Sequence, residues 1–499
     1  MAEKVKKQFK MPSSFTVLFI IIALMALLTW FIPAGQYETN EAGNLIAGTY
    51  SQVDPNPQGL YEIFMAPVRG MLGTKLTSGA IEVSFFIIMV GGFLGVVTET
   101  GALDVGIASV IKNNKGREKR LIPILMLLFA LGGTTYGMGE ETMAFYPLLI
   151  PVMIGVGFDT ITAVSIILIG SQIGCLASTV NPFATGVASQ AAGISIGDGI
   201  LWRVIFFIVM YAISVVFVYR YASKIEKDPT KSYSYHTRDA DLSHFHVEKT
   251  TDSLSGRQKT VLWLFALTFI IMVISLIPWT DLNPNFTFFE SLNAFVAGIP
   301  FIGQLIGHPE VLGMWYFQEI TMLFIIMAIV IGMLYRMKEE RFIQVFISGA
   351  GELLGVALIC AVARGIQVVM NDGMITATIL HWGEQGLSNL SSQVFIVLTY
   401  LFYLPMSFLI PSTSGLAGAT MGIMAPLGEF AKVPAHLIIT AFQAASGILN
   451  LITPTSGIVM GALALGRIEL TVWWKYIAKL IAVVFVASIA ILVLATFFV

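Results

Sequence analysis

The sequence predicts an all-α polytopic membrane protein, and three observations support that fold class. Hydrophobic residues make up 56% of the 499 residues and charged residues only 12%, whereas soluble domains carry about 25% charged residues. Apolar runs of about 20 residues recur along the chain. Three sequence patterns of the first half also reappear, in the same order, in the second half. Together these observations predict an internally duplicated protein of the lipid bilayer.

Apolar runs mark nine expected crossings, because a helix needs about 20 residues to span the hydrocarbon core. They cover residues 15–33, 79–97, 160–195, 200–220, 259–279, 317–335, 347–370, 435–465 and 476–499. Lys and Arg gather in segments 112–120, 220–258 and 336–341, and are absent from 280–316 and 371–392. Because basic residues favour the cytoplasmic side, we expect the N-terminus inside and the C-terminus outside.

Two pairs of shorter apolar stretches should form re-entrant hairpins. Residues 121–133 and 142–155 flank the polar stretch GTTYGMGEE, and on this topology both ends lie inside. Residues 393–410 and 420–427 flank PSTSGLAG and return to the outside. Non-helical backbone at membrane depth persists only where protein or a water-filled cavity surrounds it. Both tips should therefore line a cavity.

The recurring patterns indicate two inverted repeats. VVTETG at residue 96 matches VVMNDG at 368, and TTYGMGEETM at 134 matches STSGLAGATM at 412. Gln172, before Pro182, likewise matches Gln443, before Pro454. The three offsets agree within about seven residues, as expected of an ancient duplication. Because the two hairpins open to opposite sides, the repeats are inverted, an architecture typical of secondary transporters with a substrate site near the midplane.

These features predict the organisation of the whole chain. The expected parts are a cytoplasmic N-terminus (1–14), a first repeat (15–220) with a hairpin near 121–155, a cytoplasmic linker (221–258), a connecting helix (259–279) and a second repeat (317–499) with a hairpin near 393–427. Each repeat should contain one broken transmembrane helix, in 160–195 and in 435–465.

Three intramembrane charges are candidates for substrate contact. Glu140 and Glu141 align with Gly418 and Ala419 of the second repeat, so the fold does not require them. A charge at the bilayer centre costs about 2.5 to 3.5 kcal/mol and is usually functional, although a glutamate could instead pair with an arginine or cap a helix. Arg364 lies centrally in its run and could hold a substrate carboxylate or neutralise a glutamate; the sequence leaves both options open.

Hydroxyl and amide residues at the helix breaks complete the candidate site. ASTVNPFATG (177–186) and LITPTSG (451–457) would expose N–H groups, which favour a carboxylate, and carbonyls, which favour a cation. The candidate substrate-binding residues are Thr134, Thr135, Tyr136, Gly137, Glu140, Glu141, Asn181, Arg364, Ser412, Thr413, Ser414, Thr453, Thr455 and Ser456. A Na⁺ ion could bind near Ser178, Thr179 and Asn450.

The sequence resembles a known family over nearly its whole length. The segments GTTYGMGEETMAFYPLLIPVMIGVGFD, ASTVNPFATGVASQAAGI, IPSTSGLAGATMGIMAPLG and LITPTSGIVMGALALGRIE are similar to the YfcC-type branch of the C4-dicarboxylate anaerobic carrier family, in the ion-transporter superfamily. The resemblance implies two inverted repeats with opposed hairpins, elevator-type alternating access and, in many members, a homodimer. Similar proteins of lactic-acid bacteria and streptococci exchange arginine for ornithine, whereas the family name points to dicarboxylates.

The charges favour a cationic substrate. A cavity with two carboxylates and at most one guanidinium would repel a dianion unless it were protonated or cation-bound. We therefore expect a secondary active transporter of the cytoplasmic membrane that exchanges arginine and ornithine. The alternative is an ion-coupled carrier, driven by Na⁺ or H⁺, of C4-dicarboxylates, other small carboxylates or peptides.

The remaining sequence features exclude other classes. The net charge is -2, and no basic stripe suggests a nucleic-acid partner. Cys175 and Cys360 lack paired spacing, and the six histidines form no ligand pattern. We expect no resident cofactor or metal, no enzymatic activity, and membrane lipids and a small-molecule substrate as the partners.

Overall fold

The computed structural model describes residues 14–39, 45–46, 48–103, 105, 118–245, 255–277, 279–282, 285–387 and 390–498. The predicted cytoplasmic N-terminus (1–14) and the basic segment 112–120 lie outside these ranges, except for residue 14 and residues 118–120.

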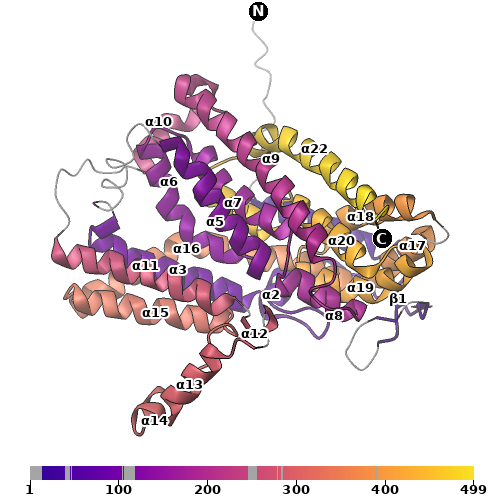
Figure 1. Ribbon diagram of the computed structural model, residues 1–499, viewed down its shortest axis with the longest axis horizontal. Helices are drawn as coiled ribbons and strands as arrows, with labels where there is room; N and C mark the ends of the chain where they lie inside the picture. Colours follow the sequence, from indigo (N-terminus) through magenta and orange to yellow (C-terminus); the bar gives the residue numbers. More distant parts are fainter. Residues whose placement is uncertain are drawn as a thin grey trace, which may run out of the picture.

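Most of the described chain is helical (Figure 1). The helices before the linker are α1 (Ser14–Leu28), α2 (Leu60–Leu72), α3 (Ile81–Glu99), α5 (Leu121–Tyr136), α6 (Tyr146–Gly155), α7 (Thr160–Leu176), α8 (Val187–Ala192), α9 (Ile200–Lys227) and, within the linker, α10 (Arg238–His244). Those after it are α11 (Gly256–Leu276), α12 (Trp279–Leu282), α13 (Phe288–Gly298), α14 (Ile302–Ile306), α15 (Phe317–Leu334), α16 (Glu339–Asp372), α17 (Thr376–Leu387), α18 (Ser392–Leu409), α19 (Thr413–Phe430), α20 (Ala435–Leu449), α21 (Gly457–Leu465) and α22 (Leu470–Ala495).

Shorter elements join these helices. The 3₁₀ helices are η1 (Glu118–Arg120), η2 (Glu140–Phe145), η4 (Pro229–Lys231) and η5 (Tyr235–Thr237), and η3 (Pro182–Gly186) is a π-helical turn. Strands β1 (Gly35–Gln36) and β2 (Ser51–Gln52) pair antiparallel, with Gly35 opposite Gln52. This small sheet departs from the all-helical prediction, because the loop after α1 folds back on itself.

Seven described helices are long and apolar enough to cross a membrane: α3, α9, α11, α15, α16, α18 and α22. Four shorter apolar helices, α1, α5, α7 and α20, fall below that length. These helices are those of a multi-pass membrane protein, while nine crossings, two hairpins and two inverted repeats remain predictions. The expected spans 160–195 and 435–465 are each interrupted, where Pro182 and Pro454 cannot donate a helical hydrogen bond.

The long helices form two groups. α16 packs against α1, α2 and α3, and α15 packs against α3 and α11; we call these six helices the α16 group. In the second group, α7 packs against α5, α6, α9, α20 and α21. Helices α18, α19 and α22 pack against α20, and α19 also packs against α8. We call α5–α9 and α18–α22, together with η2 and η3, the α7 group. In Figure 1, α3, α11 and α15 lie below α6, α7 and α9. The main contacts between the groups join α16 to α21 and α3 to η2.

Glycines allow helices within each group to touch at the backbone. A Cβ atom on Gly91 of α3 would lie 2.5 Å from the carbonyl oxygen of Gly349 in α16. A Cβ atom on Gly133 of α5 would lie 2.1 Å from the carbonyl oxygen of Ser171 in α7. Small residues at such crossings are how membrane helices pack closely without a hydrophobic driving force between them.

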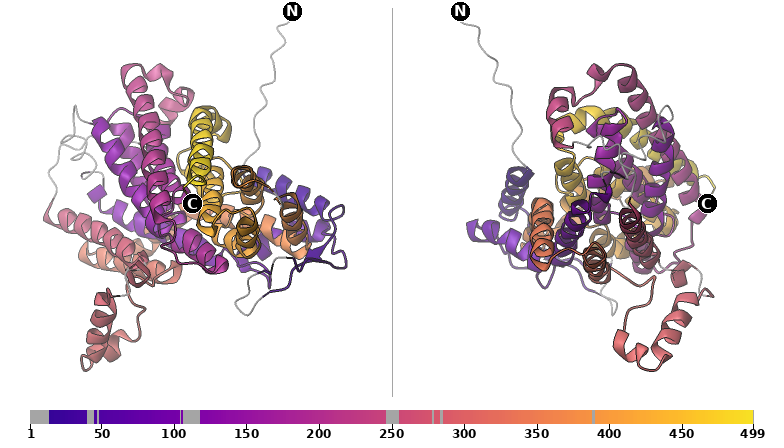
Figure 2. Two further views of the ribbon diagram at one scale, coloured as in Figure 1. Left: turned by 45° about the vertical axis from the view of Figure 1, so that its right-hand side comes forward. Right: turned by 90° about the vertical axis from the view of Figure 1, so that its left-hand side faces the viewer.

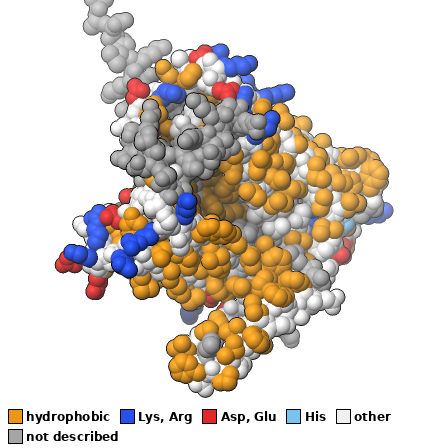
Figure 3. Space-filling model, turned by 60° about the vertical axis from the view of Figure 1, so that its left-hand side comes forward, with side chains coloured by type: hydrophobic (Ala, Val, Ile, Leu, Met, Phe, Trp, Pro, Cys, Tyr) orange, Lys and Arg blue, Asp and Glu red, His pale blue; other side chains and the backbone are white. Residues whose placement is uncertain are grey.

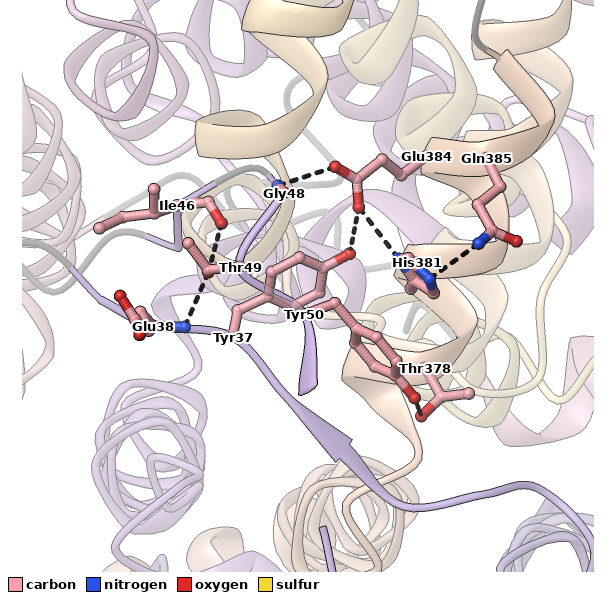
Figure 4. Close-up of polar contacts among 10 residues, drawn as sticks. All are labelled: Tyr37, Glu38, Ile46, Gly48, Thr49, Tyr50, Thr378, His381, Glu384 and Gln385. Carbon is pink, nitrogen blue, oxygen red and sulfur yellow. Dashed lines mark hydrogen bonds and ion pairs between the residues drawn. The ribbon is translucent and has the colours of Figure 1, made fainter. Parts of the chain in front are cut away.

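Polar side chains fasten the β1–β2 segment to α17 (Figure 4). Glu384 accepts hydrogen bonds from the Tyr37 hydroxyl at 2.7 Å and from the backbone N–H of Gly48 at 2.9 Å. The His381 ring, whose Nδ1 lies 3.1 Å from Glu384, stacks on Tyr50 with ring centroids 4.0 Å apart. Burial and the hydrogen bond to Glu384 raise the pKa of Tyr37, so its hydroxyl remains a donor. The segment is thus held on a helix that also packs against α18 and α19.

Many large hydrophobic side chains are exposed on the described part of the protein. α13 and α14 project from the body in Figure 1, and their exposed side chains include Phe288, Phe295 and Leu305. On the face shown in Figure 3, hydrophobic side chains cover the middle, and charged side chains gather toward the upper and left margins. Exposed apolar surface of this extent is expected where a helix faces lipid.

Candidate functional site

A cavity of about 160 Å³ lies at the boundary between the two helix groups. The predicted site residues that line it are Gly137, Glu140, Glu141, Asn181, Arg364, Ser412, Thr413, Ser414, Asn450, Thr455 and Ser456. Arg364 belongs to α16, whereas the others belong to the α7 group and the turns within it. The structure therefore brings together, from distant parts of the chain, most of the charged and polar residues predicted from sequence.

The two glutamates begin the 3₁₀ helix η2. Gly137 ends α5 with a left-handed backbone (φ 77°), and a Cβ atom there would lie 2.6 Å from Oδ1 of Asn181, so this turn needs glycine. Glu141 is only 4% exposed and accepts a hydrogen bond from the backbone N–H of Gly139 at 2.8 Å. Among the described residues, the Glu140 side chain has no hydrogen bond to another residue. The pair therefore differs: Glu141 supports its own turn, and Glu140 is not engaged by any other residue.

Arg364 reaches the same cavity from the opposite helix group. Its Nη1 lies 3.5 Å from Oε1 of Gln367, one turn further along α16. Within the described residues, no ion pair of 4.0 Å or less joins Arg364 to Glu140 or Glu141. Opposite charges thus line one cavity without direct contact, which leaves room for a charged molecule between them.

The break after α7 is held together by its own hydroxyl and amide groups. Thr134 donates to the carbonyl oxygen of Ala177 at 2.7 Å and accepts from the backbone N–H of Thr179 at 3.0 Å. Asn181 accepts from the backbone N–H of Phe183 at 2.9 Å and donates to Ser178 at 3.1 Å. Thr134, Ser178 and Thr179 stabilise the turn and do not line the cavity.

Two other members of the predicted set also lie off the cavity. Thr135 donates to the carbonyl oxygen of Leu131 one turn back, and Thr453 shares a 2.7 Å hydrogen bond with Thr455. Thr455 does line the cavity, although its hydroxyl also donates to the carbonyl oxygen of Phe408. The side chain of Tyr136 falls outside the described part of the structure.

Two helix N-termini open on the cavity. Ser412 caps the 18-residue helix α19 by accepting from the backbone N–H of Gly415 at 3.2 Å, and Ser412, Thr413 and Ser414 line the cavity. Ser456 occupies the N-cap position of α21. The N-terminus of a helix carries a partial positive charge from its unpaired N–H groups. This side of the cavity therefore favours an anionic group.

Comparison with known proteins identifies the family. The family model of the C4-dicarboxylate anaerobic carriers (DcuC) matches residues 11–497. This chain belongs to that family. The carrier is accordingly a membrane transport protein.

Two relatives extend over almost the same length as this carrier. An uncharacterized protein of Haemophilus influenzae is 30% identical, with 96% of each chain covered. The protein named putative basic amino acid antiporter YfcC, of Escherichia coli, is 28% identical over 97% of this chain and 96% of its own.

Two solved structures are distantly similar. MtrF of Neisseria gonorrhoeae, described as illuminating a class of antimetabolite efflux pumps, is 16% identical with a TM-score of 0.43, over 97% of this chain and 95% of that chain. The YdaH transporter of Alcanivorax borkumensis is 14% identical with a TM-score of 0.42, over 97% and 98%.

The cavity of the carrier also contains residues that sequence reasoning missed. Tyr316, at the start of α15, lines it and packs on Phe183 with ring centroids 5.0 Å apart, so the two rings meet across the group boundary. Cys175 and Cys360 line it as well, although in sequence they read as ordinary small hydrophobic residues. Gln172 is fully buried, and its Oε1 has no partner among the described residues. An amide repeated at matched positions within apolar runs was the signal that could have identified Gln172.

The arrangement can hold a molecule that carries charges of both signs. Glu140 and Glu141 supply negative charge to the cavity, while Arg364 and the start of α19 supply positive charge. An ammonium or guanidinium group would be attracted to the glutamates, and a carboxylate to Arg364 and the start of α19. In a site shielded from water, such interactions are stronger than they are in solution.

Proposed function

We propose that this carrier exchanges basic amino acids, arginine against ornithine, across the cytoplasmic membrane. The observation that carries the proposal is the charge of the cavity: two carboxylates, Glu140 and Glu141, and one guanidinium, Arg364. The formal sum is -2 + 1 = -1, and arginine and ornithine each carry a net charge of about +1 near neutral pH. The substrate would therefore neutralise the cavity that it enters.

The polarity of the cavity suggests how the substrate lies. Its side-chain cation would face Glu140 and Glu141, and its α-carboxylate would face Arg364 and the first N–H groups of α19. Tyr316 and Phe183 would cover the cation with their ring faces, an arrangement that favours guanidinium. The name of the Escherichia coli relative, a putative basic amino acid antiporter, supports the same substrate class.

A second candidate is a C4-dicarboxylate, because that substrate gives the family its description. Arg364 and the N-termini of α19 and α21 could hold one carboxylate. The second carboxylate would meet Glu140 and Glu141, and would bind only if those groups were protonated or shared a cation. This carrier would then require coupling to H⁺ or Na⁺.

We propose elevator-type alternating access, in which the α7 group moves relative to the α16 group. The inverted repeats, the two re-entrant hairpins, the inside N-terminus and outside C-terminus, and a homodimer belong to the same proposal. A coupling Na⁺ would lie near Asn450, which lines the cavity, and near Ser178 and Thr179. We expect no enzymatic activity.

Transport in proteoliposomes tests the proposed substrate. Purified carrier is reconstituted into vesicles loaded with unlabelled ornithine, and uptake of radiolabelled arginine, aspartate, succinate and small peptides is measured with and without ion gradients. We expect arginine uptake that requires internal ornithine. Accumulation of succinate without arginine would refute the cationic substrate and favour the dicarboxylate.

The proposed orientation has a separate test. In a background without Cys175 and Cys360, a cysteine at position 235 should be protected from an impermeant thiol reagent on intact cells, and a cysteine at position 300 should be labelled. Labelling of position 235 from outside would reverse the orientation.

A further inference from the structure

A groove of about 740 Å³ runs between α9 and α22 and shares no lining residue with the substrate cavity. The two helices contact each other and lie side by side in the left panel of Figure 2. Ile213, Val216, Leu480 and Val483 are among the apolar residues that line the groove. Only 22% of the apolar window of α9 and 28% of that of α22 is buried within the protein. Both helices therefore present a broad face to the surrounding lipid.

One end of the groove is basic. Arg220 and Lys224, one turn apart on α9, and Lys479 on α22 line it together. Within the described residues, none of the three forms an ion pair or a side-chain hydrogen bond. Three cations without an acidic partner at one place attract an anion.

Helix length places this basic end at the hydrocarbon boundary. The apolar run that forms most of α9 extends from Ile200 to Tyr219 and contains one charge, Arg203; the apolar run that begins at Leu480 in α22 extends to Phe498, just beyond the end of the helix at Ala495. Each run is about 20 residues long, enough for one crossing. The helices run in opposite directions, so Arg220 and Lys479 end their apolar runs at the same membrane surface. The ring centroids of Tyr221 and Tyr476 lie 4.7 Å apart at this level, which confirms the alignment of the two boundaries.

We propose that this groove is a binding site for an anionic phospholipid. The phosphate and headgroup would lie among Arg220, Lys224 and Lys479, and an acyl chain would lie along Ile213, Val216 and Val483. Basic pockets between membrane helices on the cytoplasmic side bind acidic lipid headgroups in this way. A soluble phosphate ion would leave the apolar part of the groove empty, and a neutral phospholipid would leave three cations without a counter-charge. The combination of charge and apolar length selects an anionic lipid.

The floor of the groove connects the site to helix α7. The Tyr221 hydroxyl donates to Asp159, which caps the N-terminus of α7 by accepting from the backbone N–H of Thr162 at 2.8 Å. The Tyr476 hydroxyl accepts from Ser165 of α7. A lipid that immobilises α9 against α22 would therefore stabilise the start of the helix that leads to the cavity.

Native mass spectrometry of the purified full-length carrier in detergent tests the site. Dioleoylphosphatidylglycerol and dioleoylphosphatidylcholine, which have the same chains, are added at equal concentration. We expect the anionic lipid to remain bound at about tenfold lower concentration than the neutral one. Each substitution Arg220→Gln, Lys224→Gln or Lys479→Gln should weaken retention of the anionic lipid about fivefold. Inorganic phosphate at millimolar concentration should not displace it.

Two further variants separate a specific site from a diffuse surface charge. Lys475→Gln removes an exposed cation one turn earlier on α22, outside the groove, and should retain the anionic lipid like the parent protein. Val216→Trp fills the groove without changing charge, and since Val216 is 47% exposed, the protein should fold; retention should fall about tenfold. Equal losses for Lys475→Gln and Lys479→Gln would overturn the proposal. So would unchanged retention in Val216→Trp, displacement by phosphate, or a dimer that Val216→Trp dissociates without loss of lipid.

Discussion

Two segments at the cavity, residues 134–143 and 412–421, align in sequence but have different backbone structures. At the first, α5 ends at a left-handed glycine and a 3₁₀ helix follows that begins with Glu140 and Glu141. At the second, α19 begins almost at once after α18, with a serine cap and no charge. The first segment contributes negative charge to the cavity, and the second contributes the positive end of a helix. Two segments of similar sequence thus contribute opposite charges to one cavity, because only the first contains carboxylates.

The largest expected effect comes from removing those carboxylates. Glu140→Gln or Glu141→Gln keeps size and removes the charge, and loss of a charge-assisted contact of about 1.5 to 3 kcal/mol should weaken arginine binding roughly tenfold to a hundredfold. Glu140→Gln should show the larger loss, since part of the Glu141 carboxylate is already engaged by Gly139. Binding is measured by arginine-dependent thermal stabilisation and by exchange in vesicles.

A matched control lies at the aligned position in the second segment, within α19. Gly418 aligns with Glu140, and a Cβ atom there would meet only Val187 Cγ1 at 3.8 Å, so Gly418→Ala should bind arginine normally. Normal affinity in both glutamate variants would instead assign the pair a structural or proton-binding role.

A smaller effect is expected at Arg364, on the opposite wall. Arg364→Gln should weaken arginine binding about tenfold through loss of the contact to the carboxylate. Agmatine lacks the carboxylate, so its affinity should not change. In this variant agmatine should therefore bind as well as arginine. Arg69→Gln is the control, because Arg69 pairs with Asp372 at the end of α16 and lies outside the cavity.

The same substitution distinguishes two roles for the guanidinium. If Arg364 only balances a glutamate, combining Arg364→Gln with Glu140→Gln should restore expression and leave the ranking of arginine over agmatine unchanged. That ranking is measured by competition against radiolabelled arginine.

The smallest effect is expected at the cap of α19. Ser412→Ala removes the oxygen that accepts from Gly415, a loss of about 1 kcal/mol, and should reduce affinity for arginine about fivefold. Ser412→Thr keeps a capping hydroxyl and should behave as the parent. If Ser412→Ala weakens the binding of agmatine as much as that of arginine, the N-terminus of α19 does not bind the substrate carboxylate.

Much of the helical framework could be predicted from the sequence, because an apolar run of about 20 residues is long enough to span the bilayer and too apolar for a surface helix. Several predicted spans agree with helices to within a few residues, such as 317–335 with α15. α2 and α17 were missed because each is a short helix of mixed polarity that is stabilised by neighbours distant in the chain. The β1–β2 segment was missed for the same reason.

For the site, charge was more informative than hydroxyl groups. Glu140, Glu141 and Arg364 are costly in a membrane, so their presence alone pointed to the cavity that they line. Thr134 and Thr453 belonged to the same polar clusters, yet they hydrogen-bond to nearby groups and lie off the cavity. Whether a hydroxyl bonds locally depends on backbone geometry that a composition pattern does not contain.

The glycine contacts of the fold also determine where the molecule resists deformation. Within the α7 group, Gly447 of α20 would place a Cβ atom 2.4 Å from Cα of Leu176, as Gly91 and Gly349 do within the α16 group. Helices whose backbones are in contact in this way cannot move past each other without first separating. Across the boundary, a Cβ atom on Gly457 of α21 would first meet a side-chain atom, Sγ of Cys360, at 2.9 Å.

Side chains can rotate out of the way, so we expect the proposed movement of the α7 group to follow the plane of this boundary. The cavity lies on that plane, with Glu140 and Glu141 on one face and Arg364 on the other. Shear along it pulls opposite charges apart, which requires work against their attraction. A substrate cation bound to the glutamates would neutralise them and so remove that attraction. The proposed movement would then be slower with an empty cavity than with an occupied one. Transport would therefore be restricted to one-for-one exchange.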